Sequence, residues 1–70
     1  MRSLNGIVGK RLREVRTAAG WSQSRLEEQS GIPQARISRY EKAHVLPSVE
    51  SLDRLAAPLG LTLSEFFRGI

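Results

Sequence analysis

Apolar residues recur at helical spacing along almost the whole chain, and no stretch alternates apolar and polar residues as a strand would. In the first such stretch, Val8, Leu12, Val15 and Ala19 fall on one helical face. The same periodicity recurs four more times. It predicts five helices, at about 6–19, 22–30, 33–42, 48–58 and 62–69. We therefore expect an all-α fold.

The residues at the helix ends support these boundaries. Ser22 is a good N-cap for the second predicted helix, and Gly31, which is expected to adopt a positive φ, should end it. Pro58 lacks a backbone N–H, so the fourth helix should kink or end near residue 57. Thr62 and Glu65 have the spacing of a capping box for the last helix.

Length and composition exclude several classes of protein. Seventy residues are enough for one domain, expected to span 1–70. The chain has no Cys and only one His, His44, so neither disulfides nor a zinc site is expected, and no cofactor is implied. It offers no nucleophile–base pair for an enzyme. With no membrane-length apolar run and no signal-peptide pattern in MRSLNGIVGK, we expect a cytoplasmic, nucleoid-associated protein.

Charge is distributed unevenly along the chain. The net charge is +4. Residues 1–42 hold nine Lys or Arg against four Asp or Glu, a net +5, whereas residues 43–70 hold two against three, a net −1. A basic front and a near-neutral tail suggest a surface for a polyanion and a separate packing or pairing end. On charge alone, solvated helix surfaces explain the basic residues equally well.

The second and third predicted helices match the helix-turn-helix pattern, in which the second helix enters the major groove of DNA. On a helical wheel, Ile37, Tyr40 and Pro33 lie on one side of the third helix. The opposite side carries small or hydrogen-bonding residues, with Gln34 and Arg36 at its edges: Ala35, Ser38, Arg39 and Lys42. Gln suits an adenine edge and Arg a guanine edge. The alternative interpretation is an ordinary solvated polar face.

The order and spacing of several segments resemble the phage-repressor and Cro-like (Xre-type) family of helix-turn-helix DNA-binding proteins. The segments are GKRLREVRTAAGWSQSRL, Gly31, ISRYE at 37–41, Pro47 and SLDRLAAPLGLTLSEFF. The resemblance covers residues 6–68. It implies a five-helix lambda-repressor-like bundle that binds double-stranded operator DNA, usually as a homodimer on a palindromic site, to regulate transcription.

The resemblance also implies roles for individual residues. Gln23 falls where the family contacts a DNA phosphate and supports the recognition helix. The base-contacting positions correspond to Gln34, Ala35, Ser38 and Arg39, and Arg36 and Lys42 fall where bases or phosphates are contacted. Arg16 and Glu41 match a pair that ties the first helix to the third, so we expect a structural role for both.

Four departures from the family pattern affect these expectations. Glu27 replaces a small residue where the second and third helices approach, so its carboxylate should bend outward or pair with Arg36. Pro33 replaces the usual Ser or Thr cap, which leaves Ile32 as the expected cap. Ala43 replaces a glycine, and the loop that follows it is HVLP rather than basic. Val45 and Leu46 in that loop are therefore expected to be exposed unless the fold or a partner covers them.

Further residues are candidates for supporting contacts. Phosphate contacts are expected from Gln23, Arg25, Lys42, Arg11 and Arg13, although the last two suit a solvated helix surface equally well. The last helix is expected to supply a dimer interface from Phe66, Phe67 and Ile70, with ordinary core as the alternative, especially for Leu63 and Phe66. The expected DNA contacts and the expected dimer interface together predict a homodimeric regulator, most simply a repressor. The competing hypothesis is a protein–protein module, such as an antitoxin or adaptor, whose partner contacts Glu27, Val45 and Leu46.

Overall fold

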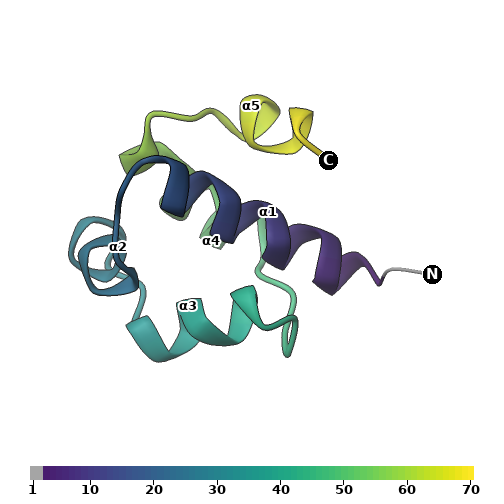
Figure 1. Cartoon of the computed structure of the whole chain (residues 1–70), viewed down its shortest axis with the longest axis horizontal. Helices are drawn as coiled ribbons and strands as arrows, with labels where there is room; N and C mark the ends of the chain where they lie inside the picture. Colours follow the sequence, from purple (N-terminus) through teal and green to yellow (C-terminus); the bar gives the residue numbers. More distant parts are fainter. Residues whose placement is uncertain (1–2) are drawn as a thin grey trace.

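The computed structural model describes residues 3–70, so the first two residues of the expected domain 1–70 lie outside the described part. Those 68 residues form five α-helices and one short 3-10 helix, with no strand among them (Figure 1). The elements are α1 (Leu4–Ala18), α2 (Gln23–Ser30), α3 (Gln34–Glu41), α4 (Val49–Ala56), η1 (Ala57–Leu59) and α5 (Leu63–Arg68). The predicted all-α fold is confirmed.

Capping side chains explain where the helices begin. The hydroxyls of Ser22, Ser48 and Thr62 each accept a backbone N–H three residues ahead. Helix α1 begins two residues earlier than predicted, because the Ser3 hydroxyl accepts the N–H of Gly6 at 3.1 Å. The expectation that Ile32 caps α3 is wrong. Pro33 takes that position, and Ile32 is buried in the core.

The end of α4 follows the prediction made from Pro58. Helix α4 stops at Ala56, and the chain tightens into η1 across the proline. Gly60 then takes a φ of 78°, which reverses the chain towards α5. Thr62 and Glu65 form the predicted capping box, with both hydrogen bonds present.

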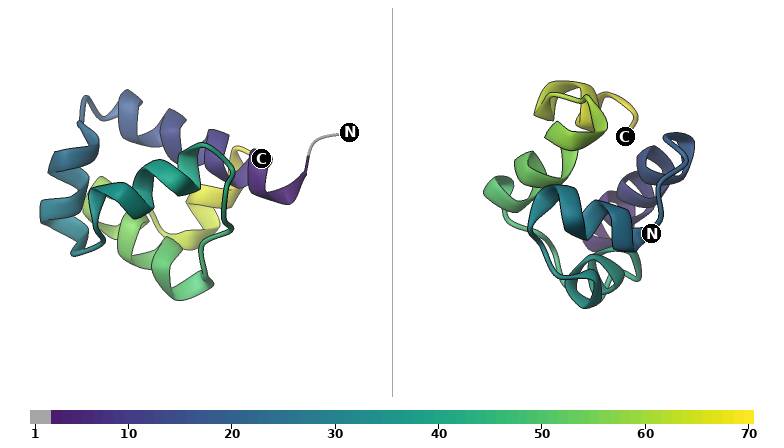
Figure 2. Two further views of the ribbon diagram at one scale, coloured as in Figure 1. Left: turned by 90° about the horizontal axis from the view of Figure 1, so that it is seen from below. Right: turned by 90° about the vertical axis from the view of Figure 1, so that its left-hand side faces the viewer.

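Helix α1 runs through the middle of the molecule and separates α3 from α5. Figure 1 shows α3 on one side of α1 and α5 on the other, and the right-hand view of Figure 2 shows α5 and α3 at opposite ends of the picture. Helix α2 closes one end, between α1 and α3, and α4 lies behind α1. The recognition helix expected from the sequence and the last helix therefore occupy opposite sides of the bundle.

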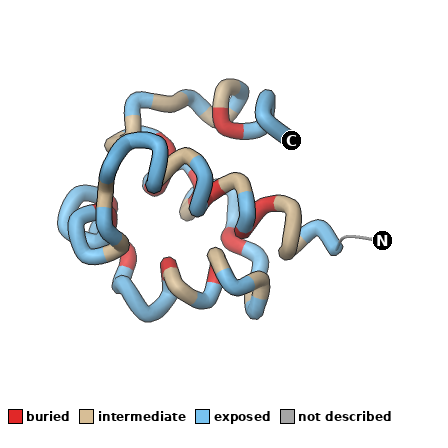
Figure 3. Tube along the Cα trace, viewed as in Figure 1, coloured by how far each residue is buried: buried red, intermediate tan, exposed pale blue. Residues whose placement is uncertain are grey.

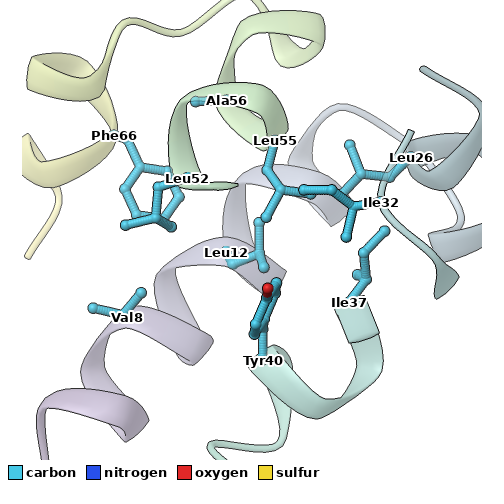
Figure 4. Packing of buried hydrophobic residues seen from close by; sticks show 10 residues of the cluster. All are labelled: Val8, Leu12, Leu26, Ile32, Ile37, Tyr40, Leu52, Leu55, Ala56 and Phe66. Atoms are coloured by element: carbon cyan, nitrogen blue, oxygen red, sulfur yellow. The ribbon is translucent and has the colours of Figure 1, made fainter. Parts of the chain in front are cut away.

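One apolar core joins all five helices (Figure 4). Its most deeply buried side chains are Phe66, Leu12, Leu26, Ile32, Ile37 and Leu55. Tyr40 is 5% exposed and packs from α3 towards α1. Figure 3 shows the buried positions of α3 turned towards the core; of its other positions, Ser38 and Glu41 are partly buried and the rest are exposed. The inward face predicted for α3, with Ile37 and Tyr40, is confirmed.

Candidate nucleic-acid interface

A sharp turn at Gly31 joins α2 to α3. Gly31 has a φ of 75°, the left-handed conformation predicted from the sequence, and its N–H is accepted by the carbonyl of Glu27 at 2.8 Å. Leu26, Ile32 and Ile37 pack beneath this turn in the core. The two helices therefore form a compact helix-turn-helix unit whose outer side is α3.

The base-contacting face predicted from the sequence lies on the outside of α3. We use this name for Gln34, Ala35, Arg36, Ser38 and Arg39. All are exposed except Ser38, which is half-buried. Among residues 3–70, no hydrogen bond or ion pair engages the side chains of Gln34, Arg36 or Arg39. The polar groups of this face are thus free to contact another molecule.

A buried ion pair holds α3 against α1 from behind. Arg16 Nε and Nη2 donate to the two carboxylate oxygens of Glu41 at 2.7 and 2.9 Å, a bidentate geometry. The side chains are only 11% and 5% exposed. The hydrogen bond to Glu41 raises the pKa of the Arg16 guanidinium above its ordinary value, against the opposing effect of burial. The pair expected from the sequence is present.

Gln23 joins this ion pair from the first position of α2. Its amide Nε2 donates to Glu41 Oε1 at 3.1 Å, and Arg16 Nη1 donates to the carbonyl of Trp21 at 2.7 Å. The network thus ties α1 and the start of α2 to the end of α3. A side-chain amide nitrogen carries two N–H groups, so Gln23 retains one for an outside acceptor.

Glu27 makes a contact that the sequence analysis did not anticipate. Its carboxylate Oε1 accepts the backbone N–H of Gln34 at 2.6 Å, in place of the expected outward bend or pair with Arg36. Pro33, the N-cap of α3, offers no side-chain acceptor. Helix α3 is therefore capped by a side chain from α2. The sequence signal that could have indicated this cap is the combination of Glu27 in α2 with Pro33, which has no side-chain acceptor, at the start of α3.

Arg11 was expected to contact a DNA phosphate, but its guanidinium is bound within the protein. Its Nε donates to the carbonyl of Phe66 at 2.6 Å and its Nη2 to the carbonyl of Glu65 at 3.0 Å, which joins α1 to α5 on the side away from α3. These carbonyls attract the guanidinium because the C-terminus of a helix carries partial negative charge. Arg13 and Lys42 are exposed, and the Arg25 guanidinium stacks on Trp21, 4.4 Å from the ring centroid.

A surface groove runs beside the base-contacting face. It has a volume of about 510 Å³ and lies between α3 and the loop that follows it. It is lined by Pro33, Ala35, Arg36, Arg39, Tyr40, Val45 and Leu46. Leu46 is 40% exposed, as predicted, whereas Val45 is half-buried, because the fold packs it against the core.

The candidates for a dimer interface divide into two groups. Phe66 is 0% exposed and belongs to the core, which contradicts its place in the interface. Phe67 and Ile70 are 40% and 53% exposed. The two phenylalanines meet edge to face, with ring centroids 5.3 Å apart. Phe66 thus belongs to the core, whereas Phe67 and Ile70 remain candidates for the interface.

The described residues contain no other obvious kind of site. No three His, Cys, Asp or Glu side chains between residues 3 and 70 gather as metal ligands would. Over the same range, every helix is too short or too polar to cross a bilayer. In the last helix, the N–H of Thr62 bonds to the Glu65 carboxylate and lowers the pKa of Glu65, a capping effect rather than a sign of chemistry.

Comparison with known proteins agrees with this geometry. A family described as helix-turn-helix matches residues 12–66. The HTH-type transcriptional regulator PuuR of Escherichia coli (strain K12) is 46% identical over 59 residues, which cover 84% of this chain and 32% of PuuR. An HTH-type transcriptional regulator of Haemophilus influenzae is 47% identical over 55 residues, covering 79% of this chain and 56% of that protein.

The chain thus spans about a third of PuuR and just over half of the Haemophilus protein. No solved structure matches it at a significant level. The resemblance stated from the sequence is confirmed by the family match, which includes α2, the turn at Gly31 and all of α3. This chain belongs to the helix-turn-helix family.

Proposed function

We propose that this protein is a DNA-binding transcriptional regulator that places α3 in the major groove. The observation that carries this proposal is the base-contacting face: exposed polar side chains without partners, on a helix that is anchored from behind by Arg16 and Glu41. Relatives named as HTH-type transcriptional regulators support the same function. Binding requires no chemical step, so the function needs neither enzyme activity nor a cofactor.

In this proposal, base edges are contacted mainly by Gln34 and Arg39. Both side chains are exposed on α3 and can form bidentate bonds, with adenine and guanine respectively, at ~1–3 kcal/mol of discrimination each. Ala35 suits a thymine methyl group. Phosphates are contacted by Arg25, Arg13 and Lys42, and by the second N–H of Gln23. These contacts supply affinity that falls with salt.

A homodimer would double these contacts. Phe67 and Ile70 are large and exposed on the side of the bundle away from α3, which suits a two-fold contact. Two α3 helices must then lie about 34 Å apart on one face of the duplex, which implies a palindromic operator. Occupying a promoter in this way represses transcription by excluding polymerase. Residues 1–70 would form one DNA-binding domain, which acts on the nucleoid in the cytoplasm.

Selection from a random duplex pool at two salt concentrations tests the proposal. The wild-type protein should enrich a two-fold symmetric site, and Arg39→Ala should lose preference at one base pair in each half-site. Lys10→Ala is the matched control, because it removes a positive charge from the exposed surface of α1 beside the chain end, away from α3. Weak binding that enriches no site, and depends only on salt, would overturn the proposal.

A second candidate function is a protein–protein module. The groove between α3 and the following loop favours it, because Leu46 remains 40% exposed beside Arg36 and Arg39. Leu46→Ser distinguishes the two functions. It should leave site selection by a DNA regulator largely unchanged, and it should abolish function if the loop binds a protein partner.

A further inference from the structure

The start of α3 depends on a residue from outside the helix. The first N–H groups of any α-helix lack partners within the helix. Here the N-cap is Pro33, which has no side-chain acceptor, and the next N–H groups that bond locally are those of Arg36 and Ile37, both to the carbonyl of Pro33. The N–H of Gln34 is accepted instead by Glu27, seven residues earlier, at 2.6 Å.

Glu27 fixes both ends of the turn between the two helices. Its backbone carbonyl accepts the N–H of Gly31 at 2.8 Å and ends α2, while its carboxylate accepts the N–H of Gln34 and starts α3. Hydrogen bonds to an ionised acceptor are about twice as strong as neutral ones, and a negative charge is favoured at a helix N-terminus. One side chain thus sets the position of the first turn of α3.

We propose that Glu27 is a positioning residue for base recognition: its carboxylate holds the first turn of α3 so that the Gln34 amide meets its base edge. This inference rests on the proposed DNA-binding function. A bidentate contact requires placement of the amide within a few tenths of an ångström. Gln34 carries both the backbone N–H that Glu27 holds and the exposed amide that is proposed to contact the base.

The effect of Glu27 is confined to one end of α3. Arg39 lies more than one turn further along, where Ile37 and Tyr40 are buried and Glu41 is held by Arg16. Loosening the first turn should therefore displace Gln34 while leaving Arg39 in place. A residue that only stabilised the fold would weaken both contacts equally.

The test compares base preferences of Glu27→Ala, Glu27→Gln and Glu28→Ala with those of wild type, again by selection from random duplexes. The base pair contacted by Gln34 is identified as the one whose preference disappears in Gln34→Ala. Glu27→Ala should lower discrimination at that base pair roughly three- to tenfold and leave the Arg39 position unchanged. Glu27→Gln retains an acceptor oxygen and should recover most of the preference. Glu28→Ala changes a neighbour that is also exposed and has no side-chain hydrogen bond among residues 3–70, so it should match wild type.

Other outcomes overturn the inference in distinguishable ways. If wild type enriches a site but Glu27→Ala loses preference at every position alike, or at none, the positioning role of Glu27 is wrong and the proposed function stands. If wild type enriches no site, both fail together. Amide hydrogen exchange verifies that each variant is folded. Should Glu27→Ala not fold, Glu27→Asp, whose carboxylate is one carbon shorter, replaces it with the same expected result.

Discussion

Two arginines of α1 hold the two opposite sides of the molecule, and they do so by different chemistry. Arg16 reaches the carboxylate of Glu41 at the end of α3, in a pair that is almost fully buried. Arg11, five residues earlier, reaches the backbone carbonyls of Glu65 and Phe66 at the end of α5. Figure 1 shows these two helices on either side of α1.

The difference between the partners determines how firmly each side is held. A buried carboxylate that loses its arginine remains as an uncompensated charge, whereas a backbone carbonyl that loses its arginine can bond to water. The α3 side should therefore be rigid and costly to disturb, and the α5 side more tolerant. This suits a helix that must present side chains accurately to DNA, and a helix end proposed to meet another copy.

The largest effect should come from breaking the ion pair on the α3 side. Arg16→Met leaves Glu41 buried without a cation and should cost about 3 kcal/mol, which lowers Tm by ~10 °C or more. The loss of stability is measured by thermal unfolding, monitored by circular dichroism. Arg13→Met, an exposed arginine on the same helix, is the control and should stay within ~0.5 kcal/mol of wild type. Equal Tm values for the two variants would show that the pair contributes little.

A close helix–helix approach offers a second way to test the α3 side. A Cβ added at Gly9 would overlap the carbonyl oxygen of Tyr40 and lie 3.2 Å from that of Glu41, so Gly9→Ala must push α3 away from α1. We expect a loss of about 1–3 kcal/mol, measured by urea unfolding, because overpacking exceeds the gain from helix propensity.

Gly6→Ala is the matched control for Gly9→Ala. It makes the same substitution in the same helix, but its nearest neighbour is the Ser3 hydroxyl at 3.4 Å. It should raise stability by up to ~1 kcal/mol, because Ala loses less backbone entropy than Gly when it folds into a helix. A gain for both variants would mean that α1 and α3 can separate without cost, and that the α3 side is not the rigid one.

These residues also show what a sequence can predict in this fold. Ser22, Thr62 and Pro58 act through neighbours in the chain, so the helix ends that depend on them could be predicted. The outward face of α3 followed from its periodicity alone. Arg11 has no such local signal, because its acceptors lie more than 50 residues away and are backbone atoms that any sequence provides. The sequence could therefore not predict that its guanidinium is engaged at the end of α5.

The cap that Glu27 supplies to α3 was partly predictable, unlike the contact of Arg11 and less so than the helix ends. The sequence identified Glu27 as unusual and Pro33 as a poor cap, but the distance between them depends on the angle of the turn at Gly31. Phe66 is a similar case, because the sequence offered both interface and core for it, and the packed structure, in which Phe66 is 0% and Phe67 40% exposed, decides for the core. Contacts that depend on the angle between helices therefore required the coordinates.

A smaller effect is expected on the α5 side. Arg11→Gln removes two charge-assisted hydrogen bonds to carbonyls that water can then reach, so the expected loss of stability is about 1 kcal/mol. If Phe67 and Ile70 form the dimer contact, self-association measured by analytical ultracentrifugation should weaken as well. The salt dependence of DNA binding should not change. A salt slope lower by ~1 would instead restore the phosphate role of Arg11.

The smallest expected effect is a gain in stability, at the C-terminal end of α3. Ala43 has a φ of 64°, a conformation that costs a residue with a Cβ ~1–2 kcal/mol, whereas glycine adopts it freely. Glycine also loses more entropy on folding, so Ala43→Gly should raise the free energy of unfolding by only about 0.5–1 kcal/mol. Ala57→Gly is the control, because Ala57 follows α4 with an ordinary helical φ of −56° and should lose stability. Opposite signs for one substitution at two helix ends would locate the strain at Ala43, on the side that holds α3. Equal losses would show that the end of α3 carries no such strain, and that the ion pair and the contact at Gly9 alone distinguish it from the α5 side.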